Sequence, residues 1–394
     1  MTATQPVWSL VQLQNGFPFS SEDFSPTGRT PLVRIRDLYA DNFSVFLNVT
    51  VPEAFLLRNG DLVIGMDGDF NVARWQRGAA ALNQRLCRLR PRPGTDIRFV
   101  EYALPRALSE IHATQYSTTV KHLSSEEVMH CRVPALPVDE QRRIADFLDD
   151  QVSRIEQAAV ARQAQIRLIE TLEAVRCDGA VRNARGTRRG RLKDLLKAPP
   201  SYGVLKPGYV DEGVPLVRIV DLPTHGAVAA GSVRRITPQQ SVEYARTIVR
   251  TGDVLVGVVG TIGRPVIVDP NLDGANLSRA VARLQLRDGV DPRYVRAMLR
   301  LPAFSAWTSE ITQGTAQAVL NMGDLPNYPI AVPDPADMHD LGAALAAIEL
   351  EGLAVLGTLK RARQLLMEYK QSLITAAVTG QIDVTTASGR SIPA

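Results

Sequence analysis

The sequence predicts a mixed α/β fold that occurs twice in one chain, with the two α/β domains separated by two long antiparallel helices. Three observations predict it: the length of 394 residues, an internal repeat, and two proline-free stretches with coiled-coil spacing. At about 150 residues per domain, the length indicates two to three domains. With 45% hydrophobic and 22% charged residues, the composition excludes a disordered, collagen-like or wholly coiled-coil chain.

The repeat is the most informative feature of the sequence. Residues 31–38 read PLVRIRDL and residues 215–222 read PLVRIVDL, identical at seven of eight positions. Further pairs follow in the same order: NGDLVIG at 59–65 matches TGDVLVG at 251–257, and DIRFV at 96–100 matches DPRYV at 291–295. The offset grows from 184 to 197 residues, so short insertions in the second copy account for the drift. Half of the chain is therefore one structural unit.

Each copy begins with short apolar runs that Gly, Pro, Asn and Asp separate. Examples are VRI, LVIG and VLVGVVG. This pattern predicts strands and turns with a few helices. We expect a compact α/β domain over residues 1–136 and a second one over residues 182–333.

Each copy ends in a long stretch, residues 137–181 and 334–380, in which apolar residues recur at alternating steps of four and three. The first stripe is Leu148, Val152, Ile155, Ala159, Arg162, Ile166 and Ile169, with Arg162 as the exception. The second is Leu341, Leu345, Ile348, Gly352, Val355, Leu359, Ala362, Leu366, Tyr369 and Leu373, with Gly352 as its weak point. One such helix alone would favour packing on its own domain.

Duplication changes that expectation, because two similar helices bury their stripes most simply against each other. We expect an antiparallel pair with a domain at each end, a pseudo-two-fold dumbbell, followed by a tail over residues 381–394. A helix over residues 144–176 would be about 50 Å long, longer than the ~34 Å of one DNA turn.

Two segments carry a resemblance to a known family. Residues 134–148 read PALPVDEQRRIADFL and residues 372–384 read SLITAAVTGQIDV. They resemble the P-L-P-x-x-E-Q-R-x-I-x-x-F-L pattern and the C-terminal hallmark of the specificity subunits of type I restriction-modification systems. Segments 15–19, 65–71, 252–255, 260–263 and 314–317 resemble parts of that family's target-recognition domains, so the resemblance covers nearly all of the chain. Residues 332–340, VPDPADMHD, lack the Glu-Gln pair, so both helix starts need not engage a partner equally.

The resemblance implies a DNA-binding subunit of a bacterial defence system. Each domain would read half of a bipartite, asymmetric site in double-stranded DNA, with a non-specific spacer between the halves. The chain would direct adenine-N6 methylation and restriction by two methyltransferase subunits and two ATP-dependent translocase-nuclease subunits. S-adenosylmethionine, ATP and Mg²⁺ are then expected in those partners and no cofactor in this chain. At the start of the first long helix, the candidate partner-binding residues are Glu140, Gln141, Arg142 and Phe147.

The residues themselves do not indicate catalysis. Residues 198–202, APPSY, lack the amide of an adenine methyltransferase N-P-P-Y motif. Residues 257–263, GVVGTIG, have neither G-x-G-x-x-G spacing nor a Walker lysine. Asp334, Asp337 and Asp340 are not accompanied by the lysine that is usual in a nuclease site. We interpret them as the acidic residues that are common at the start of a helix. The five histidines show no metal-ligand spacing, and no metal site is expected.

The compartment is predicted from the cysteines and the N-terminus. Cys87, Cys131 and Cys177 are odd in number and far apart, so neither a disulfide framework nor a zinc knuckle is indicated. The first ten residues show no basic and apolar leader, and no later window holds about 18 uncharged apolar residues. We expect a cytoplasmic chain without a membrane partner.

Polar and arginine side chains in glycine-marked turns are the candidates for DNA contact. Only six of the 45 Lys and Arg residues are lysine, a bias that suits DNA reading but that a GC-rich genome would also produce. The candidates are Asn71, Arg74, Trp75, Arg77, Asn83, Arg85, Thr118, Thr119 and Lys121 in the first domain, and Tyr202, Lys206, Tyr209, Arg264, Arg279, Thr315 and Gln317 in the second.

Each candidate type has a stated chemistry. Arg or Lys pairs with guanine and Asn or Gln with adenine, at roughly 1 to 3 kcal/mol of discrimination. Trp75 or the tyrosines could fill the space left by a flipped base, although a buried tryptophan is more common. Five arginines after the first helix could contact phosphates or form a solvated linker. They are Arg182, Arg185, Arg188, Arg189 and Arg191.

Two other functions stay open at this point. The chain could be a self-contained methyltransferase or nuclease with unrecognised motifs, which methyl transfer by the purified chain would support. It could instead be a coiled-coil scaffold that binds only proteins, which predicts no sequence-selective retention of DNA.

Overall fold

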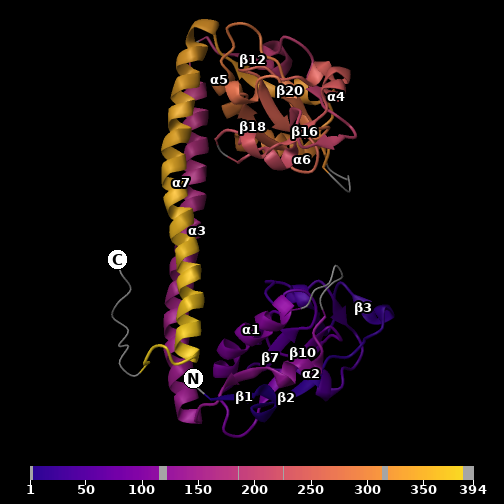
Figure 1. The fold of residues 1–394 in the computed structure, drawn as a ribbon, viewed down its shortest axis with the longest axis vertical. Coiled ribbons are helices and arrows are strands. Elements are labelled where there is room, and N and C mark those ends of the chain that lie inside the picture. The colour runs from indigo at the N-terminus through magenta and orange to yellow at the C-terminus, as the bar shows by residue number, and fades with distance from the viewer. Residues whose placement is uncertain (1–2, 115–121, 185, 225, 313–317, 385–394) are drawn as a thin grey trace. The chain divides into compact units, whose positions relative to one another are not determined.

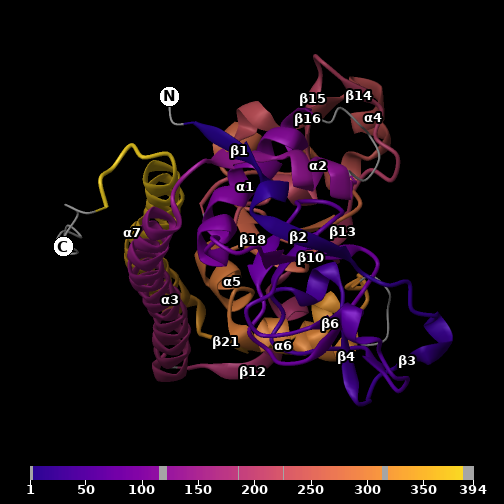
Figure 2. The same ribbon diagram turned by 90° about the horizontal axis from the view of Figure 1, so that it is seen from below.

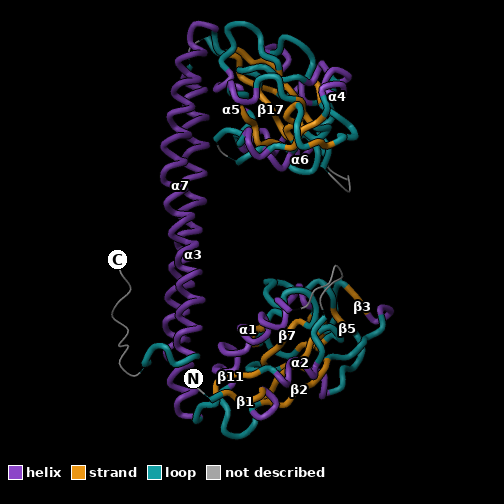
Figure 3. Tube along the Cα trace, viewed as in Figure 1, coloured by secondary structure: helices purple, strands orange, loops and turns teal. Residues whose placement is uncertain are grey.

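The computed structural model describes residues 3–114, 122–184, 186–224, 226–312 and 318–384. The chain divides into two compact units (Figures 1 and 3). Unit 1 comprises Met1–Ala161 and Arg363–Ala394, and unit 2 comprises Arg162–Ala362. Each unit therefore contains parts of both long helices.

Unit 1 is built on a four-stranded antiparallel sheet of order β2-β10-β7-β8, beside a five-stranded mixed sheet of order β3-β5-β4-β9-β6. In the mixed sheet, β4 and β9 pair in parallel. A two-stranded ladder joins β1 to β11 near the start of the first long helix. The strands are β1 (Thr4–Pro6), β2 (Val11–Asn15), β3 (Phe24–Ser25), β4 (Thr30–Val33), β5 (Phe46–Leu47), β6 (Leu56–Leu57), β7 (Leu62–Gly65), β8 (Val72–Arg74), β9 (Ala80–Leu82), β10 (Leu86–Pro91) and β11 (Arg132–Pro134); the short helices are α1 (Ile97–Thr114) and α2 (Ser125–His130).

Unit 2 repeats this plan. Its antiparallel sheet has the order β13-β20-β17-β18, its second sheet the order β14-β16-β15-β19 with β15 and β19 parallel, and β12 pairs with β21. The strands are β12 (Arg188–Arg191), β13 (Ser201–Tyr202), β14 (Tyr209–Val210), β15 (Val214–Val217), β16 (Arg234–Ile236), β17 (Val254–Gly257), β18 (Gly263–Ile267), β19 (Asn276–Leu277), β20 (Val281–Leu284) and β21 (Pro329–Val332); the short helices are α4 (Pro238–Glu243), α5 (Pro292–Met298) and α6 (Pro302–Ile311).

The central strands are buried on both faces, with the period of two expected for strands. In β7, Leu62 and Ile64 belong to the core that α1 covers, and Val63 belongs to the core on the other face. In β17, Val254 and Leu255 divide between two cores in the same way. The apolar runs of the sequence are thus the centres of the two sheets.

Three arginine–aspartate pairs recur in the two units at matching positions. Arg34–Asp37 matches Arg218–Asp221, Arg88–Asp61 matches Arg283–Asp253, and Arg98–Asp96 matches Arg293–Asp291. The internal repeat therefore extends from strand order to buried side chains.

The two long helices are α3 (Val138–Asn183) and α7 (Pro335–Val378). In unit 1, Ile144 near the start of α3 shares a core with Ala377 near the end of α7, and Lys370 binds Glu156 at 2.6 Å. In unit 2, Val181 near the end of α3 shares a core with Leu341 near the start of α7. The helices are therefore antiparallel in each unit, and they lie side by side in two views (Figures 1 and 2). The predicted mixed α/β fold with paired long helices is confirmed.

The predicted stripe of α7 is wrong in its middle. Val355 is exposed and Leu356 is buried instead. The reason lies one turn earlier, where buried Glu349 faces Arg300 of unit 2 and Gly352 is buried beside it. This ion pair fixes the rotation of the helix, so the buried line continues to Leu356. The stripe also fails at Tyr369, which is exposed.

Among the described helices, α7 is long and apolar enough to cross a membrane. Its ends, however, lie in protein cores: Met338 and Leu345 in unit 2, and Val378 in unit 1. Its buried Glu349 is ion-paired with Arg296 and Arg300. These contacts are those of a helix packed on protein.

Candidate DNA interface

Four chain segments meet at one edge of the antiparallel sheet in each unit. In unit 1 they are the end of β2, the turn after β7, the turn between β9 and β10, and the segment that begins at residue 122. The Met66 amide donates to the Arg85 carbonyl (3.0 Å), and the Met66 carbonyl accepts from the Leu123 amide (2.7 Å). In unit 2 the Val258 amide donates to the Ala280 carbonyl at 2.9 Å. We name this edge the loop edge: residues 15–17, 66–68, 83–85 and 122–125 in unit 1, and residues 202–204, 258–260, 278–280 and 319–322 in unit 2.

The first and third segments of the loop edge touch through glycine. A Cβ on Gly16 would lie 1.9 Å from the Asn83 carbonyl oxygen, and one on Gly203 would lie 1.6 Å from the Leu277 carbonyl oxygen. Both glycines are therefore required for the close approach. The same backbone device holds the loop edge together in both units.

Polar side chains of the unit 1 loop edge contact one another. His122 Nδ1 lies 2.6 Å from Asp67 Oδ1, and Arg85 Nη1 lies 3.6 Å from Asp67 Oδ2. Ser125 donates to the side-chain oxygen of Asn15 at 2.7 Å. Asp67 is 22% exposed, whereas Arg85 and His122 are each 58% exposed. The carboxylate thus holds two exposed side chains at the surface.

The unit 2 loop edge has the same backbone with different side chains. The bridge between Asp67 and His122 corresponds to the bridge between Val259 and Val319. Arg85 corresponds to Ala280, since their carbonyls accept the matching hydrogen bonds. The unit 2 edge is therefore apolar where the unit 1 edge is charged.

Several sequence-predicted residues lie at the loop edge. Asn83 and Arg85 do so in unit 1, and exposed Tyr202 and Arg279 do so in unit 2. Lys206 is exposed and follows the edge by two residues. Thr118, Thr119, Lys121, Thr315 and Gln317 lie outside the described residues.

Two candidates for DNA contact that follow β7, Asn71 and Arg74, make contacts within unit 1. Asn71 is half-buried, and its carbonyl accepts from the Gly65 amide (2.8 Å). Arg74 pairs with Glu101 and Asp149 (3.1 and 3.4 Å).

Trp75 and Arg77 likewise have packing roles. Trp75 is 2% exposed and its indole donates to the Gly78 carbonyl. The Arg77 guanidinium lies over Trp75 and Phe43 and donates to the Ala40 carbonyl. The structure thus places the tryptophan ring in a core and gives Arg74 and Arg77 partners within unit 1.

The comparisons with known proteins agree with this architecture. Residues 7–167 match the family model described as type I restriction modification DNA specificity domain. The EcoBI type I restriction enzyme specificity subunit of Escherichia coli is 29% identical over 405 residues, which cover 95% of this chain and 85% of that protein.

Residues 7–167 thus match a type I restriction modification DNA specificity domain, and nearly the whole chain is similar to a specificity subunit of that kind.

A solved structure shares the fold of this chain. It is a chain from work on complex assembly and conformational transition of the type I R-M system, with a TM-score of 0.66 at 17% identity. The likeness covers 96% of this chain and 98% of that chain. The fold therefore extends over both units and not only over the residues that the family model matches.

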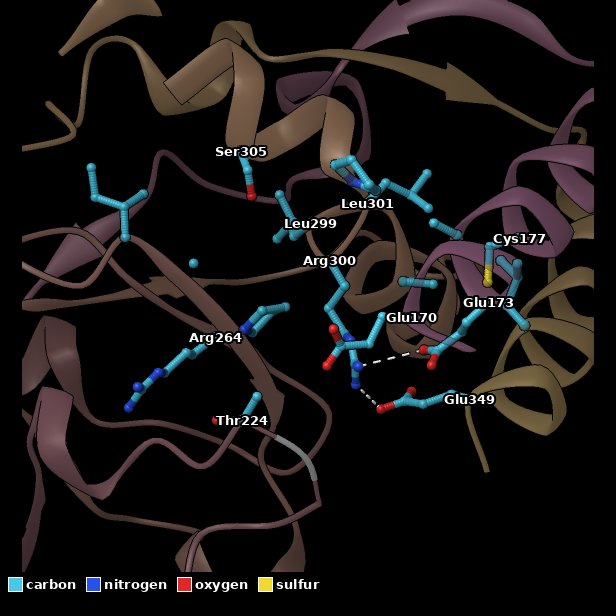
Figure 4. Close-up of a pocket in the computed structure, with 17 residues that line it drawn as sticks. Glu170, Glu173, Cys177, Thr224, Arg264, Leu299, Arg300, Leu301, Ser305 and Glu349 are labelled. Atoms are coloured by element: carbon cyan, nitrogen blue, oxygen red, sulfur yellow. Dashed lines mark hydrogen bonds and ion pairs between the residues drawn. The ribbon is translucent and has the colours of Figure 1, made fainter. Parts of the chain in front are cut away.

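The remaining candidates for DNA contact lie elsewhere in unit 2. Tyr209 is exposed on β14, with the Arg234 guanidinium 5.9 Å from its ring. Arg264 is exposed and has a positive φ of 51°. It lines a cavity of about 330 Å³ with Glu173 and Glu349 (Figure 4).

That cavity does not suit a phosphate. Burial raises the pKa of Glu173, Arg300 lowers it, and repulsion from Glu349 and Glu170 raises it further. In unit 1, Glu101 lines a cavity with Arg74 and Asp149, and burial raises its pKa. The cavities beside the long helices hold carboxyl groups that are already paired with guanidinium groups, whereas Arg85 is exposed at the loop edge, so the loop edge is the better candidate for DNA contact.

The predicted partner-binding residues divide by burial. Gln141 is 1% exposed, accepts from the Asp96 amide (3.0 Å) and donates to the Leu136 carbonyl (2.8 Å). It therefore joins the start of α3 to α1. Arg142 is exposed and pairs with Asp139 at 3.3 Å.

The other two partner-binding candidates are partly covered. Phe147 packs against the unit 1 core, and Glu140 is half-buried. At the start of α7, buried Met338 occupies the position of Gln141. The second copy lacks the Glu-Gln pair, and an apolar residue, Met338, stands where the first copy has the buried, hydrogen-bonded Gln141.

The arginine run after α3 has mostly protein partners. Arg182 pairs with Asp178 and Arg188 with Asp194, and Arg191 donates to Asn327. Arg189 is exposed, and Arg185 lies outside the described residues.

Sequence reasoning missed Asp67 and His122. Asp67 lies in the quoted segment 65–71, and the repeat aligns it with Val259. That contrast was a usable signal. His122 gains its place at the loop edge from the isolated β-bridge to Asp67, which lies far from it in the sequence.

Proposed function

We propose that this chain is the DNA-reading subunit of a type I restriction-modification complex, in which each unit reads one half of a bipartite site through its loop edge. The observation that carries the proposal is the pair of loop edges, which have matching backbone hydrogen bonds but different side chains. Such an arrangement supplies one docking geometry with two different base preferences. The family-model match, the similarity to a known specificity subunit and the shared fold support it.

The duplication favours an asymmetric site. Two identical chains related by a two-fold axis read a palindrome. Here the two loop edges belong to one chain and carry different residues, Asp67 and Arg85 in one and Val259 and Ala280 in the other. The half-sites are therefore expected to differ.

The chemistry is proposed to belong to other chains. Two methyltransferase subunits would use S-adenosylmethionine to methylate adenine at N6, and two restriction subunits would use ATP and Mg²⁺ to translocate and cut DNA. The described residues hold no cluster of three metal-ligating side chains. The complex would act on DNA in the cytoplasm, with the exposed start of α3, including Arg142, in contact with a partner.

The long helices are proposed to set the spacer. The α3 and α7 helices contain 46 and 44 residues, and each contributes to the cores of both units. A rod of packed helices has a fixed rise of about 1.5 Å per residue. The gap between half-sites would then depend on helix length.

A binding selection tests the proposal. The full chain is mixed with its methyltransferase partner and a random duplex library, and retained DNA is sequenced. The proposal expects one asymmetric motif with a fixed gap. Retention without sequence preference would favour a protein-binding scaffold, and methyl transfer by the chain alone would favour a self-contained enzyme.

A further inference from the structure

The strand register makes three positions of the two loop edges equivalent. Leu86 pairs with Gly65 in unit 1, as Val281 pairs with Gly257 in unit 2. Arg85 directly precedes Leu86, and Ala280 directly precedes Val281. The matching bridges add Asp67 with His122 in unit 1, and Val259 with Val319 in unit 2. The side chains at these three positions therefore lie on backbone with matching strand pairing in the two units.

In unit 1 the carboxylate of Asp67 positions the guanidinium of Arg85. The two groups lie 3.6 Å apart, and Asp67 is held in turn by His122 Nδ1 at 2.6 Å. The Arg85 amide donates to the side chain of Asn83 (3.2 Å), which fixes the backbone of the turn. This ion pair favours one orientation of a long, exposed side chain before a ligand arrives, so less entropy is lost on binding.

The neighbouring carboxylate also selects the kind of contact. Asp67 offsets part of the charge of Arg85 and repels a phosphate. The uncharged N7 and O6 acceptors of guanine are not repelled in this way, and a guanidinium matches them with two hydrogen bonds. Arg85 is therefore suited to a base edge more than to the DNA backbone.

In unit 2 the same positions offer no hydrogen-bonding side chain. Val259 and Ala280 are half-buried and Val319 is 38% exposed. Apolar groups of this size contact the methyl group of thymine and give no donor to guanine. The second half-site is thus read differently at the matching base.

We infer that Arg85 reads a guanine in the first half-site, with Asp67 as its positioning residue, and that Val259, Ala280 and Val319 remove this requirement from the second half-site. The inference rests on the proposed function. It assigns one base class to one half of the motif.

The test uses the full chain with its methyltransferase partner and the random duplex library. For Arg85→Ala, preference for guanine at one position of one half-site falls roughly tenfold to a hundredfold, while the other half-site is unchanged. Asp67→Asn lowers the same preference by less. The ratio between bases is the readout, because loss of folding would weaken all sequences alike.

A matched control is Arg106→Ala, which removes an exposed arginine paired with Glu110 on α1 and leaves the motif unchanged. The double change Val259→Asp with Ala280→Arg is expected to add a guanine preference to the second half-site. Unaltered guanine preference in Arg85→Ala would overturn the inference. A wild-type chain that selects no bipartite motif would instead overturn the proposed function.

Discussion

Buried carboxylates organise this chain at the scale of single residues. Asp96 in unit 1 and Asp291 in unit 2 each follow a strand and bind the arginine two residues later. Burial alone would raise the pKa of Asp291, but hydrogen bonds and attraction from Arg293 outweigh it, and the pKa is lowered. A carboxyl whose pKa is lower in the folded state stabilises the fold above its unfolded pKa. That stabilisation is lost as the pH falls through the folded value.

Asp291→Asn tests this account of acid sensitivity. Asparagine keeps the N-cap acceptor for the Arg293 amide and removes only the charge. We expect the free energy of unfolding to fall by about 2 kcal/mol at neutral pH and the difference from wild type to shrink below about pH 4. Denaturant unfolding at both pH values measures it.

Asp139→Asn is the control for that measurement. Asp139 is exposed on α3 and pairs only with Arg142 within the described residues, so its loss should change stability by less than about 0.5 kcal/mol. A deficit for Asp291→Asn that is equal at both pH values would contradict the assignment.

Single functional residues were only partly predictable. Arg85 follows from its place in a polar turn of the sequence. Asp67 and His122 are brought together by a single β-bridge between positions 55 residues apart, and no local pattern reports such pairing. Trp75 and Arg77 are residue types common in DNA contacts, but Trp75 is buried in a core, and half-buried Arg77 donates to the Ala40 carbonyl.

At the scale of elements, the long helices could be predicted because their apolar spacing is local. The expected stretches 137–181 and 334–380 compare with Val138–Asn183 and Pro335–Val378. The rotation of α7 could not be predicted, because Glu349 is fixed by arginines on another helix and the residues that follow it. Long-range ion pairs thus override the local stripe.

Gly357→Ala tests how α7 is stabilised. A Cβ at Gly357 would meet no atom within 4 Å, and alanine in a helix is better than glycine by about 1 kcal/mol. We expect a higher unfolding midpoint without a change in DNA selection. Gly203→Ala is the contrasting variant, since its Cβ would overlap the Leu277 carbonyl. Destabilisation by Gly357→Ala would contradict the packing of α7.

At the scale of the whole molecule, duplication decides what the chain can recognise. The repeat was visible in the sequence, and the structure carries it through strand order and buried ion pairs. The recognised bases could not be predicted from the sequence. Which side chains reach a groove depends on the conformation of the turns at each unit's loop edge. The loop edges reduce that question to a few positions.

Paired insertions test whether the helices set the spacer. Seven residues, which preserve the heptad phase, are added to α3 after Ala161 and to α7 after Ala362, where the two units divide. The added rise is about 10 Å, so we expect both half-sites to be retained with a gap longer by about three base pairs. An unchanged gap in the selected motif would show that the helices do not measure it.

The most direct test of the central claim is a map of N6-methyladenine across the genome of cells that carry this chain and its partner subunits, compared with cells lacking the chain. The account predicts that deletion removes methylation from one asymmetric motif with two different half-sites and a fixed gap. A palindromic or continuous motif, or methylation that does not change on deletion, would contradict it.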